Sequence, residues 1–256
     1  MHYEIFEGLV SRDTICFHGN LASNAWWEPA IAVWKRTQNS ANTGRLICAE
    51  WRGCGKSTGL ATEDELNLPA LAGDYNGLLR ELKIKDAAAI GHSTGCLIAL
   101  YAMRSAPELY SRAVLLDPVG ATGVQFGPEM YAAFTAMSRD RSMCEVVMAG
   151  TIHKANLNAE FAQRIVDDAF GVHPLIWHGV ARMLHNVDFR SELAHIKQPA
   201  LVLHGELDNI LPKENSVALA AGLPNGKFLE LPQRGHSCNI EDPELFVKHV
   251  NQFLFG

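Results

Sequence analysis

The chain has 256 residues, of which 48% are hydrophobic and 20% are charged, and its formal net charge is −6. Such values are typical of a globular protein and exclude intrinsic disorder as the main state. The slightly acidic balance offers no clustered basic face for a phosphate backbone or an anionic lipid surface, so we expect neither nucleic acid nor a membrane as a partner. The length fits one domain with an elaboration as well as two domains.

The N-terminal sequence MHYEIFEGLV lacks the basic segment and the long apolar core of a secretory signal. No later stretch approaches the roughly 18 uninterrupted apolar residues of a membrane-spanning helix. The six cysteines are scattered, without a CxxC pair or a close cluster with histidine. This pattern is typical of free buried thiols rather than of a zinc site or a disulfide framework. We therefore expect a soluble, cytoplasmic protein.

Short apolar runs bounded by turn residues recur along the chain, and most of them are continuous rather than alternating. Continuous runs are typical of parallel strands that are covered on both faces. Six strands are predicted in this way, over residues 14–19, 45–51, 87–93, 113–118, 200–205 and 227–232. The helical spacing of Leu245, Phe246, Val250 and Phe253 predicts a last helix over residues 243–254. The fold class is therefore predicted to be α/β, with a mostly parallel sheet flanked by helices.

Residues 119–195 differ from their flanks, because the strand runs disappear and helical stretches such as EFAQRIVDDAF take over. We therefore predict one α/β core made of residues 1–118 and 196–256, with residues 119–195 as a helical insertion. Several histidines fall in or at the end of the insertion, namely His153, His173, His178, His185 and His195. None forms an HExxH-type pair with a third ligand, so we expect no metal ion.

The sequence Gly91-His92-Ser93-Thr94-Gly95 has the form G-x-S-x-G, follows the apolar run AAAI and opens the helical stretch CLIALYAMR. A serine on a sharp turn between strand and helix must adopt an unusual backbone conformation, which the small residues Gly91 and Gly95 permit. The Ser93 hydroxyl would then stand above the edge of the sheet as a nucleophile. The backbone N–H of Thr94, at the helix N-terminus, would point toward an oxyanion formed on the attacked acyl group.

A serine hydroxyl needs an adjacent base, itself oriented by an acid, to act as a nucleophile at neutral pH. Asp208 lies just beyond the strand predicted over residues 200–205, and His236 lies in a loop after the last predicted strand. Functional groups gather at the carboxyl ends of strands in open α/β sheets. The chain order Ser93, Asp208, His236 is that of the nucleophile-elbow hydrolases. These three are the predicted catalytic residues.

With these motifs, essentially the whole chain resembles the α/β-hydrolase fold superfamily. The segment FHGN, residues 17–20, resembles the HG-x oxyanion loop after that family's third strand. The segments WRGCGKS, residues 51–57, and GELD, residues 205–208, resemble its RGxGxS loop and its G-x-x-D acid segment. The resemblance implies that the backbone N–H of Asn20 is an oxyanion donor together with that of Thr94. It also implies that the helical insertion follows the sixth strand and forms a cap over the active site.

Other interpretations of single residues compete with these roles. The sequence GCGKS is similar to a phosphate-binding loop, but the full pattern needs a glycine at position 50, which is Glu50. The resemblance makes His18 a structural residue of its loop rather than a catalytic one. Asp117, after the preceding strand, is the alternative acid, and Glu206 is a weaker competitor. The G-x-x-D context favours Asp208 over both.

Esters, lactones, thioesters and carbon–carbon bonds can all be cleaved by this triad, so the pocket must select the substrate. The family's dehalogenases and epoxide hydrolases carry an aspartate nucleophile where this chain has Ser93. Its carbon–carbon bond hydrolases often carry a tryptophan after the base, where this chain has Ser237; this difference disfavours carbon–carbon cleavage, which stays an open alternative. We therefore predict a hydrolase for a carboxylester or lactone with a small, largely apolar acyl group. The candidate pocket residues are Leu21, Trp26, Trp27, Phe134 and Trp177; the two adjacent tryptophans could equally belong to the core.

Two functions of other classes stay open. One is a non-catalytic ligand-binding member of the fold, since a fold alone does not establish chemistry; the intact set of three predicted catalytic residues speaks against it. The other is a thioesterase acting on acyl groups bound to a carrier protein, which nothing in the sequence names. Otherwise we expect a small-molecule substrate and no cofactor.

Overall fold

The computed structural model describes residues 1–38, 41–153, 155 and 157–256. Its central element is a seven-stranded sheet in the order β1-β3-β2-β4-β5-β6-β7. The strands are β1 (His2–Val10), β2 (Thr14–Phe17), β3 (Gly44–Glu50), β4 (Ala87–His92), β5 (Tyr110–Leu116), β6 (Ala200–Gly205) and β7 (Gly226–Leu231). Strand β1 pairs antiparallel with β3, and the other strand pairs of the sheet are parallel. The predicted mostly parallel sheet is confirmed.

Strand β1 is the element that the sequence analysis missed. It lies at the edge of the sheet, pairs with β3 alone and is largely half-exposed. A half-exposed edge strand lacks the continuous apolar run of a strand buried on both faces. The six predicted strands correspond to β2 to β7. The helical insertion follows β5, which corresponds to the family's sixth strand, because the HG-x loop that follows the family's third strand follows β2 in this chain.

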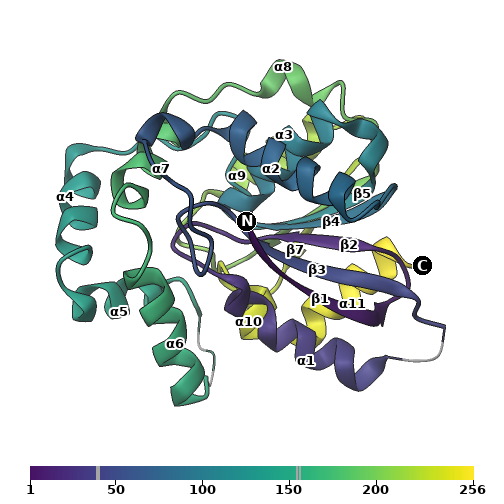
Figure 1. The fold of residues 1–256 in the computed structure, drawn as a ribbon, viewed down its shortest axis with the longest axis horizontal. Coiled ribbons are helices and arrows are strands. Elements are labelled where there is room, and N and C mark those ends of the chain that lie inside the picture. Colours follow the sequence, from purple (N-terminus) through teal and green to yellow (C-terminus); the bar gives the residue numbers. More distant parts are fainter. Residues whose placement is uncertain (39–40, 154, 156) are drawn as a thin grey trace.

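Alternate residues of each strand face two separate buried clusters. In β2, Ile15 and Phe17 belong to one cluster and Cys16 belongs to the other. Of the helices that flank the sheet, those in the first cluster are α2 (Leu68–Glu81), α3 (Thr94–Ser105) and α9 (Lys213–Gly222), and those in the second are α1 (Glu28–Thr37) and α11 (Pro243–Leu254). Figure 1 shows these two sets on opposite sides of the sheet. The helix predicted over residues 243–254 is α11, so this prediction is confirmed.

The chain between β5 and β6 is helical, as predicted. It contains α4 (Pro128–Met137), α5 (Arg141–Gly150), α6 (Ala159–Phe170), α7 (Ile176–His185) and α8 (Arg190–Leu193). The first four of these helices are grouped at the left of Figure 1, beside the sheet and its flanking helices. Their buried side chains, such as Phe134, Met148 and Ile165, belong to the same cluster as the α2 and α3 side of the sheet. The insertion therefore shares its apolar core with the sheet rather than having one of its own.

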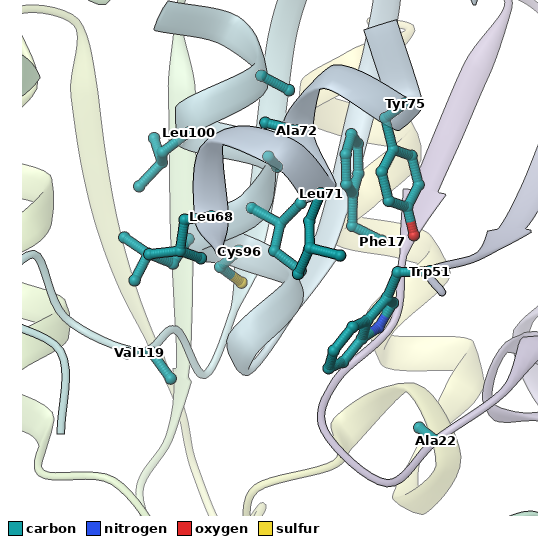
Figure 2. Close-up of a cluster of buried hydrophobic side chains, with 14 of the residues drawn as sticks. Phe17, Ala22, Trp51, Leu68, Leu71, Ala72, Tyr75, Cys96, Leu100 and Val119 are labelled. Atoms are coloured by element: carbon teal, nitrogen blue, oxygen red, sulfur yellow. The ribbon is translucent and has the colours of Figure 1, made fainter. Parts of the chain in front are cut away.

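Packing between α2 and strands β2 and β3 holds the carboxyl ends of these strands, where the FHGN and WRGCGKS segments lie. Figure 2 shows the ring of Tyr75 on α2 beside that of Phe17 on β2, and the two rings are stacked with centroids 4.1 Å apart. The Tyr75 hydroxyl donates a hydrogen bond of 2.9 Å to the carbonyl of Ala49 on β3. Trp51, which follows β3, lies next to them in Figure 2. One buried side chain thus joins α2 to both strands.

No helix in the described ranges is long and apolar enough to cross a membrane. The six cysteines are buried and free, as predicted.

The close approach of α3 to the sheet is testable at Gly95. A β-carbon there would lie 2.1 Å from the carbonyl oxygen of Phe17 and 2.5 Å from that of His18. We expect Gly95→Ala to lower the free energy of unfolding by about 1–3 kcal/mol, as overpacking does. A β-carbon on Gly77 of α2 would meet nothing within 4 Å, so Gly77→Ala should raise it by roughly 0.5–1 kcal/mol through helix propensity. Urea unfolding measures the free energy of unfolding of both variants. An equal decrease in the two variants would contradict this packing.

Candidate active site

Ser93 lies in the turn between β4 and α3, with φ 53° and ψ −121°. A non-glycine residue adopts a positive φ only where its surroundings enforce it. The Ser93 N–H donates to the Leu116 carbonyl at 3.0 Å, and the Ser93 carbonyl accepts from the Val119 N–H at 3.2 Å. A β-carbon on Gly91 would lie 2.7 Å from the Cα of Cys96. The predicted strained turn between strand and helix, and its need for small residues, are therefore confirmed.

Asp208 and His236 lie in two loops that touch, after β6 and β7. His236 Nδ1 donates a hydrogen bond of 2.8 Å to Asp208 Oδ2, and both side chains are shielded from solvent. Asp208 Oδ1 accepts from the N–H groups of Ile210 at 2.7 Å and Leu211 at 3.2 Å. Burial alone would raise the pKa of Asp208. The hydrogen bond and charge of His236, together with the two backbone N–H groups, hold that pKa below its ordinary value.

His92 connects the Ser93 turn to the His236 loop. Its Nε2 lies 2.8 Å from the His236 carbonyl oxygen, and the two imidazole rings have centroids 5.0 Å apart. A carbonyl only accepts, so Nε2 carries the proton. Burial lowers the pKa of His92 to about 3, so the ring is neutral. The variable position of the G-x-S-x-G motif therefore has a structural function that its sequence does not reveal.

The FHGN loop passes directly beside Ser93. A β-carbon on Gly19 would lie 3.2 Å from the Ser93 Cβ. The side-chain oxygen Oδ1 of Asn20 accepts a hydrogen bond of 3.0 Å from the N–H of Leu21. The backbone N–H of Asn20 takes no part in that bond. In the part of the chain that the structure describes, the backbone N–H groups of Asn20 and Thr94 have no hydrogen-bond partner. Free N–H groups are what an oxyanion needs.

His18 holds the FHGN loop against the segment after β3. Its ring stacks on the Trp51 indole with centroids 5.5 Å apart, and its Nδ1 lies 2.9 Å from Trp51 Nε1. Burial lowers the pKa of His18 to about 4, so this ring is also neutral. These contacts agree with the structural function predicted for His18.

Glu50, which the sequence analysis used only to reject a phosphate-binding loop, organises two loops. Its buried carboxylate accepts from the N–H of Asn24 at 3.0 Å and from that of Lys56 at 2.7 Å. Gly55 has φ 52°, and a β-carbon there would lie 2.4 Å from the Glu50 carboxyl group. Part of the GCGKS segment is therefore wrapped around a carboxylate, a surrounding that disfavours a phosphate.

Glu241, in the short helix α10 (Cys238–Glu241), holds both sides of the His236 loop. Its carboxylate accepts from the N–H groups of Gly235 at 2.6 Å and Ser237 at 3.1 Å, and also from that of His153 at 2.9 Å. The Ser237 hydroxyl donates to the Thr151 carbonyl at 2.8 Å. The loop that carries His236 is thus bonded to the helical insertion. No sequence signal points to this function of Glu241, because its partners are backbone groups.

Neither competing acid is hydrogen-bonded to His236 in the described residues. Asp117 is fully buried beside the pair, and its Oδ1 accepts from the N–H of Gly205 at 2.8 Å. Glu206 is exposed and accepts from the N–H of Gln233 at 2.8 Å. The preference for Asp208 agrees with this geometry.

Four of the five candidate pocket residues belong to the cluster shared with the insertion, namely Leu21, Trp26, Phe134 and Trp177. Trp26 stacks on His92, with ring centroids 6.0 Å apart. The prediction for Trp27 is wrong, because this side chain belongs to the opposite cluster and packs on Phe246 of α11 at 6.4 Å between centroids. The two tryptophans lie in the 3-10 helix Asn24–Trp27, where consecutive side chains point about 120° apart.

Asp117, Asp208 and His236 offer one metal-ligating atom each within 4.8 Å of one another, the single such group in the described ranges. The contact between Asp208 and His236 already uses Oδ2 and Nδ1 for a hydrogen bond. The structure thus brings Asp208 and His236 together, and His92 joins their loops to the Ser93 turn. Among the described residues, no hydrogen bond joins Ser93 Oγ to His236.

Comparison with known proteins gives the family. A family model described as the alpha/beta hydrolase family matches residues 15–249. The chain belongs to this family. An esterase from Exiguobacterium antarcticum has a similar structure, with a TM-score of 0.86 at 20% identity over 100% of this chain and 95% of that one. The predicted fold and enzyme class, a hydrolase of this family, are confirmed.

Curated relatives have several different hydrolase names. The "Uncharacterized hydrolase YugF" of Bacillus subtilis is 27% identical over 99% of this chain and 94% of its own length. A protein of Agrobacterium fabrum named "Putative carbamate hydrolase RutD" is 27% identical over 99% of this chain and 98% of its own. A 2-hydroxymuconate semialdehyde hydrolase of Pseudomonas putida is 26% identical over 84% and 78%. These names cover more than one bond type.

The two buried neutral histidines predict how stability depends on pH. Their folded pKa values, about 4 for His18 and about 3 for His92, lie below the unfolded value of 6.5, so the unfolded state binds protons first as the pH falls. The free energy of unfolding should therefore decrease from about pH 6.5 to about pH 4, by roughly 3 kcal/mol per histidine. Chemical denaturation across this range should give a shallower slope for His92→Gln. The exposed control His195→Gln should keep the wild-type slope; identical slopes in all three proteins would contradict the prediction.

The three hydrogen bonds to Glu241 predict a loss on its removal. Glu241→Ala should lower the free energy of unfolding by about 1.5–3 kcal/mol, since hydrogen bonds to a charged group are lost, and should speed amide exchange at Gly235 and Ser237. Glu244→Gln is the control, because Glu244 forms an exposed ion pair with Arg36 and such pairs contribute about 0–1 kcal/mol. Unchanged exchange in Glu241→Ala would show that its carboxylate does not hold the loop.

Proposed function

We propose that this hydrolase uses Ser93 as a nucleophile to cleave an ester-type bond, a carboxylester or a lactone, of a small, largely apolar acyl substrate. The main support is the 2.8 Å hydrogen bond between His236 Nδ1 and Asp208 Oδ2, in loops joined to the Ser93 turn through His92. Such a bond fixes the tautomer of the imidazole and leaves the lone pair of Nε2 for a proton.

In the proposed mechanism, His236 Nε2 takes the hydroxyl proton while Ser93 Oγ attacks the acyl carbonyl carbon. The backbone N–H groups of Asn20 and Thr94 donate to the oxyanion. The carbon–oxygen bond then breaks, and the leaving oxygen takes the proton from His236. Water, deprotonated by the same imidazole, attacks the acyl-enzyme and releases the acid and Ser93. Asp208 stays ionised throughout and stabilises the imidazolium.

We also propose that residues 119–195 act as a lid over this site. The support comes from contacts between the insertion and loops that flank Ser93. Asp168 of α6 accepts a hydrogen bond of 2.5 Å from Ser23, just after the FHGN loop. Arg182 of α7 pairs with Glu63, in the chain that follows the GCGKS segment.

The apolar character of the substrate is inferred from the side chains around these loops. Leu21, Trp26, Phe134 and Trp177 share one buried cluster with Val119, whose N–H is bonded to the Ser93 carbonyl. A largely apolar surrounding with a few polar groups suits a small organic ligand. The expected partner is thus a small molecule; its identity, the lack of a cofactor and a cytoplasmic location stay predictions.

Ser237 favours ester chemistry over carbon–carbon cleavage. Family members that cleave carbon–carbon bonds often have tryptophan at this position, whereas Ser237 is fully buried and donates to the Thr151 carbonyl. A side chain that is fully buried does not line a substrate pocket. Carbamate cleavage is the second candidate, because a relative that matches nearly the whole chain has that name, and a carbamate offers the same acyl carbonyl. A thioesterase and a non-catalytic binding protein are further outcomes of the test below.

The nucleophile is tested with Ser93→Ala and the exposed control Ser191→Ala. Wild type and control should hydrolyse p-nitrophenyl butyrate and be labelled by a fluorophosphonate probe, while Ser93→Ala should lose labelling and at least about 10³-fold in kcat. Activity of Ser93→Ala near the wild-type rate would exclude the serine mechanism.

The substrate class is tested by measuring kcat/KM of the same proteins with a lactone, a phenyl carbamate and an acyl thioester on a carrier protein. A higher kcat/KM for the carbamate or the thioester would replace the ester proposal, and labelling without turnover of any substrate would favour a binding protein.

A further inference from the structure

Asp117 is a buried carboxyl group for which the proposed mechanism has no use. It directly follows β5, has φ 44° and is fully shielded from solvent. Its N–H donates to the Leu203 carbonyl at 2.8 Å, and its Oδ1 accepts from the N–H of Gly205 at 2.8 Å. Its Oδ2 is buried, and among the described residues no donor reaches it. A buried carboxylate oxygen without a donor is costly.

Asp117 lies next to the proposed catalytic pair. Asp117, Asp208 and His236 each have an atom within 4.8 Å of the others. Asp208 has a donor on each oxygen, since Oδ1 accepts from Ile210 and Leu211 and Oδ2 accepts from His236. The Asp117 carboxyl group has one donor among the described residues, the N–H of Gly205. Two carboxyl groups this close in a dry site do not both ionise, so the proton belongs on the group with fewer donors.

Other titratable groups face Asp117, and among the described residues none of them donates a hydrogen bond to its Oδ2. They are Cys96 of α3, His204 of β6, Asp208, His236, and Cys238 and Glu241 of α10. His204 Nδ1 lies 3.4 Å from Asp117 Oδ1, and burial lowers the pKa of this imidazole. Burial raises the pKa of both thiols. Burial and then the charge of Asp208 raise the pKa of Asp117 well above its ordinary value.

We propose that Asp117 is a positioning residue of this site: a carboxylic acid kept neutral, whose Oδ2–H donates a hydrogen bond to the Asp208 carboxylate. The inference rests on the proposed function, because it assigns a supporting group to the same triad. The bond satisfies the orphan oxygen and holds the Asp208 side chain toward His236. A neutral Asp117 also adds no second negative charge beside the imidazole.

The test compares the same substitution at two positions. Asparagine has the shape of a protonated aspartic acid, accepts positive φ and can donate to Asp208 while accepting from Gly205. D117N should therefore retain kcat within about tenfold of wild type, whereas D208N should lose about 10⁴-fold, as an imidazole in the wrong tautomer does. D117A lacks the donor, and kcat should fall about ten- to hundredfold with KM little changed. The pH profile of D117N should keep the wild-type midpoint on its acid limb.

An ionised Asp117 predicts the opposite result. Removing a negative charge next to His236 would lower the pKa of the base, so the acid limb of D117N would move to lower pH. A loss in D117N as large as that in D208N, or this shift, would overturn the proposal.

Infrared spectroscopy tests the protonation state without turnover. The wild type at neutral pH should show the carbonyl band of a protonated carboxylic acid, and the band should be missing in D117N. Its absence from the wild type would overturn the proposal even if D117A failed to fold, and thermal melting identifies that failure. If Ser93→Ala remained active, the proposed function would fail while the infrared result on Asp117 still stood.

Discussion

The strained turn at Ser93 is the constraint on which the rest of the site depends. A non-glycine residue at positive φ costs on the order of 1–3 kcal/mol and persists only where its surroundings hold it. Here the N–H of Ser93 is bonded to Leu116 at the end of β5, and its carbonyl accepts from Val119 at the start of the insertion. Gly95 lets α3 lie against the carbonyl groups that end β2. Ser93, the FHGN loop and Val119, the first residue of the insertion, therefore have fixed positions relative to one another.

Carboxyl groups hold the loops that surround this turn. Such loops lack the backbone partners of helices and strands, so their N–H groups need other acceptors. Glu50 and Glu241 accept two and three backbone N–H groups, and Asp208 accepts two besides the imidazole. The Asp117 carboxyl group accepts one backbone N–H, that of Gly205. This unequal supply of donors, together with the short distance between the two aspartates, is why we assign the proton to Asp117.

The sequence predicted the parts of the site that follow buried strands, because a continuous apolar run shows where a strand ends and catalytic groups collect there. It could not predict that Asp117 lies beside Asp208, which depends on β5 pairing with β6 in the register that sets Leu116 opposite Leu203. It left Trp26 and Trp27 ambiguous, because adjacency in sequence does not say which cluster each ring enters. Glu241 left no pattern at all, since a carboxylate that binds backbone N–H groups places no requirement on the residue types of its partners.

The helical insertion and the chemistry of the core are not independent. If the insertion made no contact with the loops of the proposed catalytic residues, changes in it could alter the substrate without altering catalysis. In this chain the His153 N–H shares the Glu241 carboxylate with the two residues that flank His236, and Ser237 donates to Thr151. A shift of residues 151–153 would thus also move His236, the proposed base. A displacement of about 1 Å at a reacting group can lower the rate a hundredfold. A substitution in residues 151–153 should therefore change kcat as well as KM.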